Sequence, residues 1–405
     1  MPDLKQNKKI ITNTAYTMGG MLLLNGVLQI VVYPLLNRDM GAEQMGAVLY
    51  LMGLVSILCP SVGQALNTSR LVVRRTHKVK NGDYNLTILA LGIPGSVIAL
   101  LIAGRALPEM GLGMQAVIFV LLMVTVFRYY GDVEYRLNLN YQDYFIYYLL
   151  ISVGYLAGFG VYKISSGWFV VFLIGEAAGL TYLAVKGTVF RNFFGKSDSF
   201  SVVFKRGFFL TFSYLVTNLT QNIDRLMLKG LIGNLAVTEY YVVSLIGKTL
   251  VLLIAPVNTI VISYLTKREE NLNRRQFLGL AGIGLVISGV FFGVCQVVTP
   301  LFVRVFYPKL YDGVRGLIMV VSLAQILSLL SAFLFILVLT FTDEKWQLGL
   351  QIGHLCVMVV LILMVTPRYG IVGFSWAVLV ANGVRILAVI VLGVVRAEGK
   401  WGADG

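Results

Sequence analysis

The sequence predicts an all-α integral membrane protein with twelve transmembrane helices in two six-helix lobes. Three observations carry this prediction. Of the 405 residues, 58% are hydrophobic and 13% are charged, and the mean hydropathy is +0.81, a composition typical of membrane proteins and not of soluble domains. Apolar runs long enough to cross about 30 Å of hydrocarbon recur along the whole chain. Basic residues concentrate in every second connection between these runs.

The apolar runs predict spans at 14–36, 45–67, 86–105, 114–131, 144–163, 167–186, 207–229, 240–265, 277–300, 314–340, 346–366 and 371–395. Most of the 33 Lys and Arg residues lie on one side of these spans, for example in segments 70–80, 186–206 and 267–275. The positive-inside rule therefore places both termini in the cytoplasm. This placement accounts for the net charge of +14 without a nucleic-acid partner.

The most polar cytoplasmic connection, from about 187 to 206, divides the chain into two halves. We expect an N-terminal lobe at 1–200, which includes this connection from about 187, and a C-terminal lobe at 201–405. The halves resemble each other, because the second span of each contains a proline (Pro60 and Pro256) and ends in a basic segment. Six spans per half give both repeats the same orientation, so their pseudo-two-fold axis lies along the membrane normal.

The predicted seventh span carries polar residues along one side. Spacings of three, four and seven put them on one helical face: Thr211, Tyr214, Asn218, Gln221, Asn222, Arg225 and Lys229. Polar groups are costly in hydrocarbon, so this face is expected to line a bundle interior or a watery cavity. The pattern indicates a transporter whose path this helix lines.

Charged residues of the seventh and eighth spans lie at similar predicted depths. Asp224, Arg225 and Lys248 are ten to thirteen residues from the turn near Leu235, so they differ by only a few Å at about 1.5 Å per residue. Asp224 and Lys248 could form a structural ion pair, which would leave Arg225 as excess positive charge. Guanidinium and ammonium groups in a cavity suit an anionic substrate.

Other spans carry smaller polar faces. Asn25 and Gln29 lie four apart on the first span, Asn382 and Arg385 share a face of the twelfth, and His354 lies within the eleventh. Each could form an interhelical hydrogen bond or contact a substrate. Together they favour a polar interior that both halves share.

An intramembrane carboxylate and a row of tyrosines each allow two interpretations. Glu176 lies near the middle of the sixth span and, like Asp224, is a candidate for proton or cation coupling, or else a buried group bonded to a neighbour. Tyr144, Tyr148, Tyr155 and Tyr162 follow helical spacing on the fifth span. They could stack on sugars, but positions near span ends favour an interfacial aromatic belt.

Signals for an enzyme or a metal protein are weak. Cys59, Cys295 and Cys356 are too scattered for a metal cluster. His77 lies in a basic cytoplasmic loop and His354 lies inside a span, so these two histidines do not form a metal site. Gly195-Lys196-Ser197 lacks the upstream glycine of a phosphate-binding loop, whose place Phe190 takes. We expect no metal, no cofactor and no enzymatic activity.

Several motifs resemble the polysaccharide-transport (Wzx-like) branch of the multidrug/oligosaccharidyl-lipid/polysaccharide (MOP) exporter superfamily. They are the stretch from Tyr33-Pro34 to Gly41 and Gly46, Asp224-Arg225 before Gly233 and Tyr240-Tyr241, and Arg368-Tyr369-Gly370 before the last span. The resemblance implies two lobes around a cavity that opens alternately to each face of a bacterial cell (inner) membrane. Drug-exporting relatives commonly have a first-span acid, where this sequence has Asn25 and Gln29.

The resemblance implies a flippase for undecaprenyl-diphosphate-linked oligosaccharide, the repeat unit of O-antigen, capsule or exopolysaccharide. Arg225, Lys248 and Arg385 are then candidates to hold the diphosphate. Asn218, Gln221, Asn222, Asn25 and Gln29 are candidates for the sugars. Membrane lipid, a polysaccharide polymerase and other glycan-assembly proteins are expected partners. The alternatives are an ion-coupled small-molecule or drug exporter and, with less support, a membrane polysaccharide polymerase or ligase.

Overall fold

The structure is a computed structural model that describes residues 4–265, 273–339, 342 and 344–398. All regular elements among these residues are helices. The chain forms two compact units, unit 1 (Met1–Leu226) and unit 2 (Met227–Gly405). The boundary between them falls within one long helix, α9 (Phe200–Leu231). The predicted lobes 1–200 and 201–405 stay a prediction.

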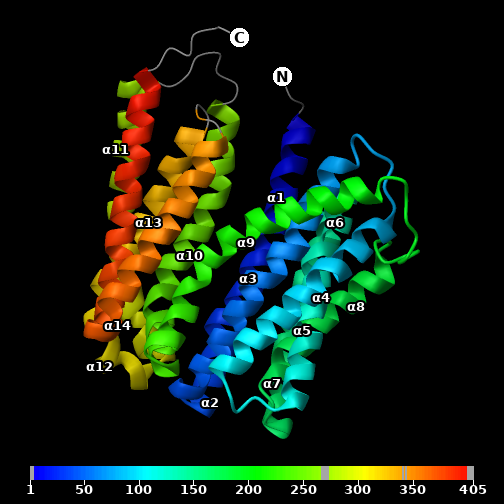
Figure 1. The fold of residues 1–405 in the computed structure, drawn as a ribbon, viewed down its shortest axis with the longest axis horizontal. Coiled ribbons are helices and arrows are strands. Elements are labelled where there is room, and N and C mark those ends of the chain that lie inside the picture. The colour runs from blue at the N-terminus through cyan, green and yellow to red at the C-terminus, as the bar shows by residue number, and fades with distance from the viewer. Residues whose placement is uncertain (1–3, 266–272, 340–341, 343, 399–405) are drawn as a thin grey trace. The chain divides into compact units, whose positions relative to one another are not determined.

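Unit 1 is a bundle of long helices (Figure 1). The bundle consists of α1 (Leu4–Gly26), a π-helical segment (Val27–Val32), α2 (Tyr33–Met40), α3 (Ala42–Val73), α4 (Asn81–Ala106), α5 (Leu112–Gly131), α6 (Val133–Asn138), α7 (Tyr141–Ser165), α8 (Phe169–Lys186) and the first part of α9. The helix α3 packs on α4 and α5, while α7 packs on α1 and α8. Gly41 joins α2 to α3 with φ of 85°, a left-handed backbone conformation that glycine adopts without strain.

The connection between α8 and α9 is held against the start of α4. The buried Asp83 carboxylate accepts hydrogen bonds from the Lys80 backbone N–H (2.8 Å), the Ser197 backbone N–H (2.7 Å) and the Ser197 hydroxyl (2.6 Å). The Asn81 amide donates to the carbonyls of Thr188 (2.8 Å) and Arg191 (3.0 Å). A Cβ on Gly82 would strike the backbone of Gly195. The polar connection that the sequence predicts is therefore docked on unit 1.

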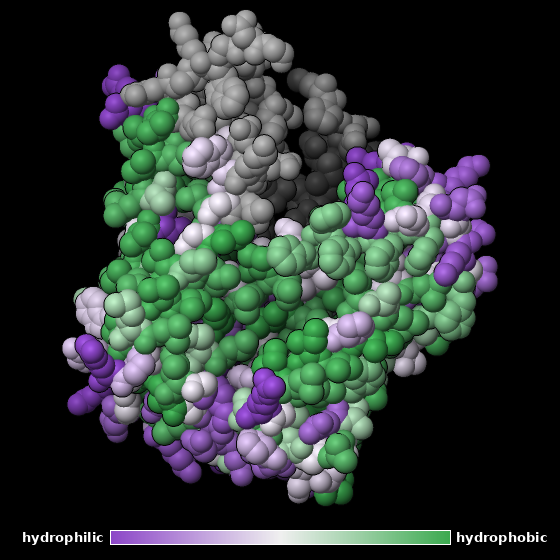
Figure 2. Space-filling view, in the orientation of Figure 1, coloured by the Kyte–Doolittle hydropathy of each residue, from purple (hydrophilic) through white to green (hydrophobic). Residues whose placement is uncertain are grey.

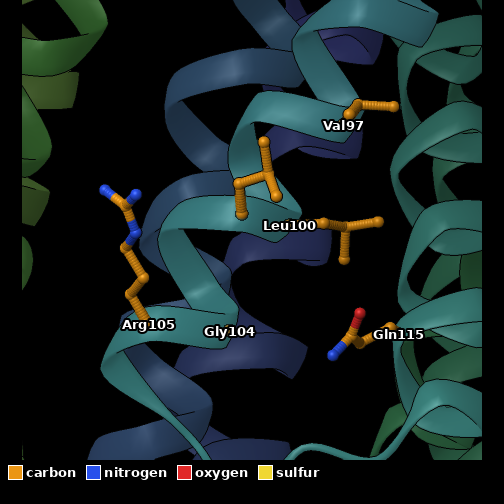
Figure 3. A pocket seen from close by; sticks show the side chains of 6 residues that line it. Val97, Leu100, Gly104, Arg105 and Gln115 are labelled. Carbon is orange, nitrogen blue, oxygen red and sulfur yellow. The ribbon is translucent and has the colours of Figure 1, made fainter.

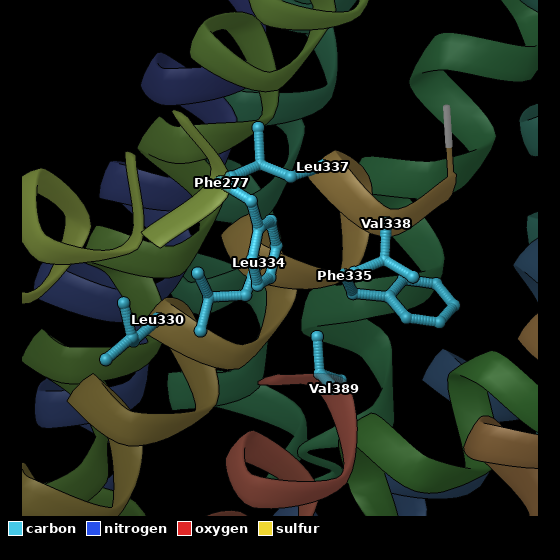
Figure 4. Packing of buried hydrophobic residues seen from close by; sticks show 7 residues of the cluster. All are labelled: Phe277, Leu330, Leu334, Phe335, Leu337, Val338 and Val389. Atoms are coloured by element: carbon cyan, nitrogen blue, oxygen red, sulfur yellow. The ribbon is translucent and has the colours of Figure 1, made fainter. Parts of the chain in front are cut away.

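Unit 2 is also helical. It contains the end of α9, α10 (Asn234–Leu265), α11 (Arg274–Phe306), a 3-10 turn (Pro308–Leu310), α12 (Tyr311–Val314), a second 3-10 turn (Arg315–Leu317), α13 (Ile318–Leu339) and α14 (Glu344–Glu398). The helix α13 packs on α10, α11 and α14. A buried cluster joins α11, α13 and α14 (Figure 4): Phe277, Leu330, Leu334, Phe335, Leu337, Val338 and Val389. A Cβ on Gly393 would strike the Phe277 ring, so glycine permits this close packing.

Nine helices among the described residues are long and apolar enough to cross a membrane. The six predicted spans of the first half each coincide with one of them. The predicted eleventh and twelfth spans both lie in α14, which breaks at Gly370 with φ of 57°. The predicted seventh and eighth spans correspond to the helices α9 and α10, which are not among these nine. The full count of twelve membrane crossings therefore stays a prediction. Figure 2 shows the apolar surface that the long helices expose.

Candidate substrate path

The polar face of α9 lies against α3 within unit 1. Tyr214 and Thr68 hydroxyls are 3.1 Å apart, and the Asn218 amide donates a hydrogen bond of 3.0 Å to the Ser61 hydroxyl. The later residue of α9, Asn218, bonds to the earlier residue of α3, Ser61, so the two helices run antiparallel here. Tyr214 and Asn218 of this face therefore contact side chains of α3 within unit 1, and the lining of a transport path by the whole face stays a prediction.

The amides of the stripe differ in their surroundings. Asn222 donates a hydrogen bond of 3.0 Å to the Asn218 carbonyl one turn earlier, which fixes its side chain along α9. Gln221 is exposed. Asn218 is half-buried and bonded to Ser61, so the exposed Gln221 is the more accessible of the two to a hydroxyl-bearing ligand.

Arg225 lies where α3 has a glycine. A Cβ built on Gly53 would be 3.1 Å from the Arg225 Cδ and 3.3 Å from its Cβ. The absence of a side chain at Gly53 therefore leaves room for the stem of the arginine. Asp224, the neighbouring coupling candidate, is buried at 8% exposure.

Asn25 and Gln29 lie at the junction of α1 with the π-helical segment. The Asn25 amide donates to the Met21 carbonyl at 2.9 Å, and the Gln29 amide donates to the Asn25 side-chain oxygen at 3.5 Å. A π-helical turn widens a helix by one residue and occurs frequently at functional sites. The structure thus brings these two predicted sugar contacts together on one helix.

Lys248, the cation predicted to lie at the same depth as Asp224 and Arg225, is half-buried on α10 in unit 2. Its neighbour Gly247 packs directly on the Gln325 side chain of α13, where a Cβ would collide. Lys248 thus extends from a helix that is held tightly to α13. Asp224 and Arg225 belong to unit 1 and Lys248 to unit 2, so their predicted common depth stays a prediction.

A polar cluster in unit 2 contains Arg385. The His354 ring Nε2 and the Asn382 side-chain oxygen are 3.1 Å apart, and the Asn382 amide donates to the Ala324 carbonyl at 2.8 Å. The Arg385 guanidinium lies one turn further along α14, 5.7 Å from the centre of the Phe335 ring. Asn382 thus joins α13 to both parts of α14, and the role of Arg385 in the predicted polar face stays a prediction.

The Glu176 carboxylate accepts hydrogen bonds from two side chains inside unit 1. Arg128 of α5 donates to it through Nε at 2.7 Å and through Nη2 at 3.3 Å, and the Tyr155 hydroxyl donates at 2.6 Å. Glu176 and Arg128 are only 3% and 4% exposed. The carboxylate is thus held by Arg128 of α5 and Tyr155 of α7, which is the geometry of a structural pair, and a role of Glu176 in coupling stays a prediction.

Another buried carboxylate, Asp132, is not among the predicted site residues. Its side chain accepts hydrogen bonds from the Asn67 amide and from the hydroxyls of Tyr144 (3.3 Å) and Tyr148 (3.4 Å), and Arg136 lies 3.7 Å away. The signal that could have found this cluster is the group of charges at the end of the fourth span, read together with the tyrosines of the fifth.

The preference for an aromatic belt is wrong for three of the four tyrosines of the fifth span. Tyr144, Tyr148 and Tyr155 are buried inside unit 1, where their hydroxyls reach Asp132 and Glu176. Burial in a lobe also removes them from contact with a sugar. Tyrosine hydroxyls satisfy carboxylates that would otherwise be costly within the membrane.

Comparisons with known proteins bear on the fold. No protein-family model matches the sequence, and no curated protein matches it significantly. The structure is similar to an inward-facing multidrug resistance MATE family transporter of the MOP superfamily, with a TM-score of 0.69 and 15% identity over 93% of this chain and 94% of that one.

Two further solved structures are similar. The lipid II flippase MurJ in an inward closed conformation aligns with a TM-score of 0.68 and 13% identity over 94% of this chain and 87% of that one. A MOP superfamily transporter from Pyrococcus furiosus aligns with a TM-score of 0.61 and 15% identity over 95% of each chain. The chain therefore has the fold of multi-pass membrane transporters of this superfamily.

Proposed function

We propose that the protein is a flippase that moves undecaprenyl-diphosphate-linked oligosaccharide from the cytoplasmic to the outer leaflet of a bacterial cell membrane. The observation that carries the proposal is the polar face of α9, with Arg225 seated over Gly53. A diphosphate needs charged donors and a glycan needs amides and hydroxyls, and this face offers both. The similarity to a lipid II flippase supports the same class of fold.

In this proposal the cations and the amides have separate tasks. Arg225, Lys248 and Arg385 bind the diphosphate. Gln221, Asn222, Asn25 and Gln29 contact the sugars, while Asn218 holds α9 to α3 through Ser61 and meets the glycan when that bond opens. Twelve spans in two six-helix lobes with cytoplasmic termini give alternating access to the two leaflets.

The experiment is complementation of surface glycan in a strain that lacks the gene. Arg225→Ala with Lys248→Ala, and separately Arg385→Ala, should abolish surface glycan while the protein stays in the membrane at the normal level. A matched control removes two cations from exposed positions, Arg38→Ala with Lys309→Ala. Normal glycan in the first two variants would overturn the assignment of the cations.

The rival function is an ion-coupled exporter of drugs or small molecules. The similarity to MATE transporters favours it, and the buried Asp224 supplies a candidate coupling acid. A deletion strain with increased drug susceptibility and unchanged surface glycan would select this function. Increased accumulation of lipid-linked oligosaccharide in the cytoplasmic leaflet would select the flippase, whose partners would include the polymerase that uses the exported units.

A further inference from the structure

One pocket of the structure lies on an exposed part of unit 1, and its lining residues come from α4 and α5 and not from α9. Its residues on α4 follow the spacing of a single helical face, and α5 contributes one more: Val97, Leu100, Leu101, Gly104, Arg105 and Gln115 (Figure 3). The pocket has a volume of about 410 Å³. The helix that forms most of it, Asn81–Ala106, is one of the candidate membrane spans.

The two ends of this pocket differ in chemistry. Val97, Leu100 and Leu101 make the end nearer the middle of α4 apolar, and Leu101 is 64% exposed to the surroundings. Arg105 and Gln115 lie on either side of Gly104 in Figure 3 and make the other end polar. An apolar groove that ends in a cation at the terminus of a membrane span matches a lipid tail and its head group.

Gly104 provides the floor of the polar end. A Cβ placed there would be 3.9 Å from the Gln115 amide nitrogen and from no nearer atom. Gln115 donates one amide hydrogen to the Met110 carbonyl at 3.0 Å, which fixes its position and leaves its second amide hydrogen for a ligand. The floor is therefore open, with a guanidinium on one side and an oriented amide on the other.

We propose that this pocket binds an anionic membrane phospholipid, with its phosphate over Gly104 between Arg105 and Gln115. One acyl chain then follows Leu100, Leu101 and Val97 along α4. Guanidinium and amide N–H groups donate to phosphate oxygens, and a basic side chain near the membrane surface attracts anionic lipid. This site is separate from the proposed substrate path and does not depend on the proposed function.

The test uses brominated lipids, which quench tryptophan fluorescence at short range. The full-length protein, with its own four tryptophans replaced by phenylalanine, carries one reporter. Ile98→Trp places the reporter beside the pocket, and Val290→Trp places it on the exposed face of α11 as a control. Each protein is reconstituted in brominated phosphatidylglycerol or brominated phosphatidylcholine.

We expect the Ile98→Trp reporter to show a preference of about fivefold for the anionic lipid, which corresponds to one basic side chain near the head groups. Arg105→Gln and the filling variant Gly104→Leu should each abolish the preference, whereas Arg38→Gln, an exposed charge of unit 1, should keep it. Val290→Trp with the same substitutions reports the bulk lipid around unit 2, and elution of each variant in detergent as a single species of normal size shows that it remains folded. An equal preference at both reporters, or a preference that survives Arg105→Gln and Gly104→Leu, would overturn the proposal.

Discussion

The Arg128 Nε and Glu176 Oε2 atoms are 2.7 Å apart in the interior of unit 1, where both side chains are buried. This ion pair joins α5 to α8, and the Tyr155 hydroxyl links it to α7. Two opposite charges cancel, so the pair adds no net charge to the bundle. It makes these three helices one connected body.

Removal of one member of this pair should destabilise unit 1. Glu176→Gln leaves Arg128 buried without its ionic partner, and loss of one partner of a buried pair costs about 3–5 kcal/mol. The measurement is the unfolding free energy of the purified protein in detergent. The double replacement Arg128→Met with Glu176→Leu should cost less than Glu176→Gln alone. The exposed Glu109→Gln is the control, and a Glu176→Gln protein as stable as that control would contradict the structural role.

A larger residue at Gly53 should separate α9 from α3. Gly53→Leu places a side chain where the Arg225 stem now lies, since even a Cβ would be 3.1 Å from the Arg225 Cδ. Overpacking of this kind costs about 1–3 kcal/mol, and we expect loss of surface glycan with normal protein level. Gly160→Leu is a matched control, because a Cβ at Gly160 meets no atom within 4 Å. Equal glycan in both variants would refute the importance of this contact.

Loss of the Asp83 carboxylate should release the connection between α8 and α9. Asp83→Ala removes the acceptor for three hydrogen bonds, two of them from Ser197. We expect trypsin to cleave after Arg191 and Lys196 about tenfold faster, which corresponds to a loss of ~1.4 kcal/mol of local stability. Asp198→Ala removes an exposed carboxylate from the same connection and should leave the rate unchanged. Equal cleavage of both variants would show that Asp83 does not hold the connection.

The helices could be predicted from the sequence because apolar runs of sufficient length are a local signal. The predicted 45–67 lies within Ala42–Val73, since hydrogen bonding continues the helix beyond its apolar part. The separation of the last two spans is also local, because Gly370 breaks α14. The π-helical segment Val27–Val32 has no comparable signal in the pattern.

The contacts of the site could be predicted only in part. The polar face of α9 follows from spacing, but its pairing with Ser61 and Gly53 depends on which helix lies opposite. Arg128 and Glu176 are far apart in sequence, so only the packing of α5 on α8 shows that they form a pair. The predicted aromatic belt is wrong for Tyr144, Tyr148 and Tyr155 for the same reason, since helical spacing gives a face and not its environment.

The central claim, transfer of a lipid-linked oligosaccharide, is tested most directly with the purified protein in liposomes. A polyprenyl-diphosphate oligosaccharide is placed in both leaflets, and a membrane-impermeant glycosidase measures the fraction that reaches the outside. We predict that the protein exposes the protected half within minutes and that Arg225→Ala with Lys248→Ala leaves it protected, while Arg38→Ala with Lys309→Ala behaves as the unaltered protein. Protection that persists with the unaltered protein would contradict the account.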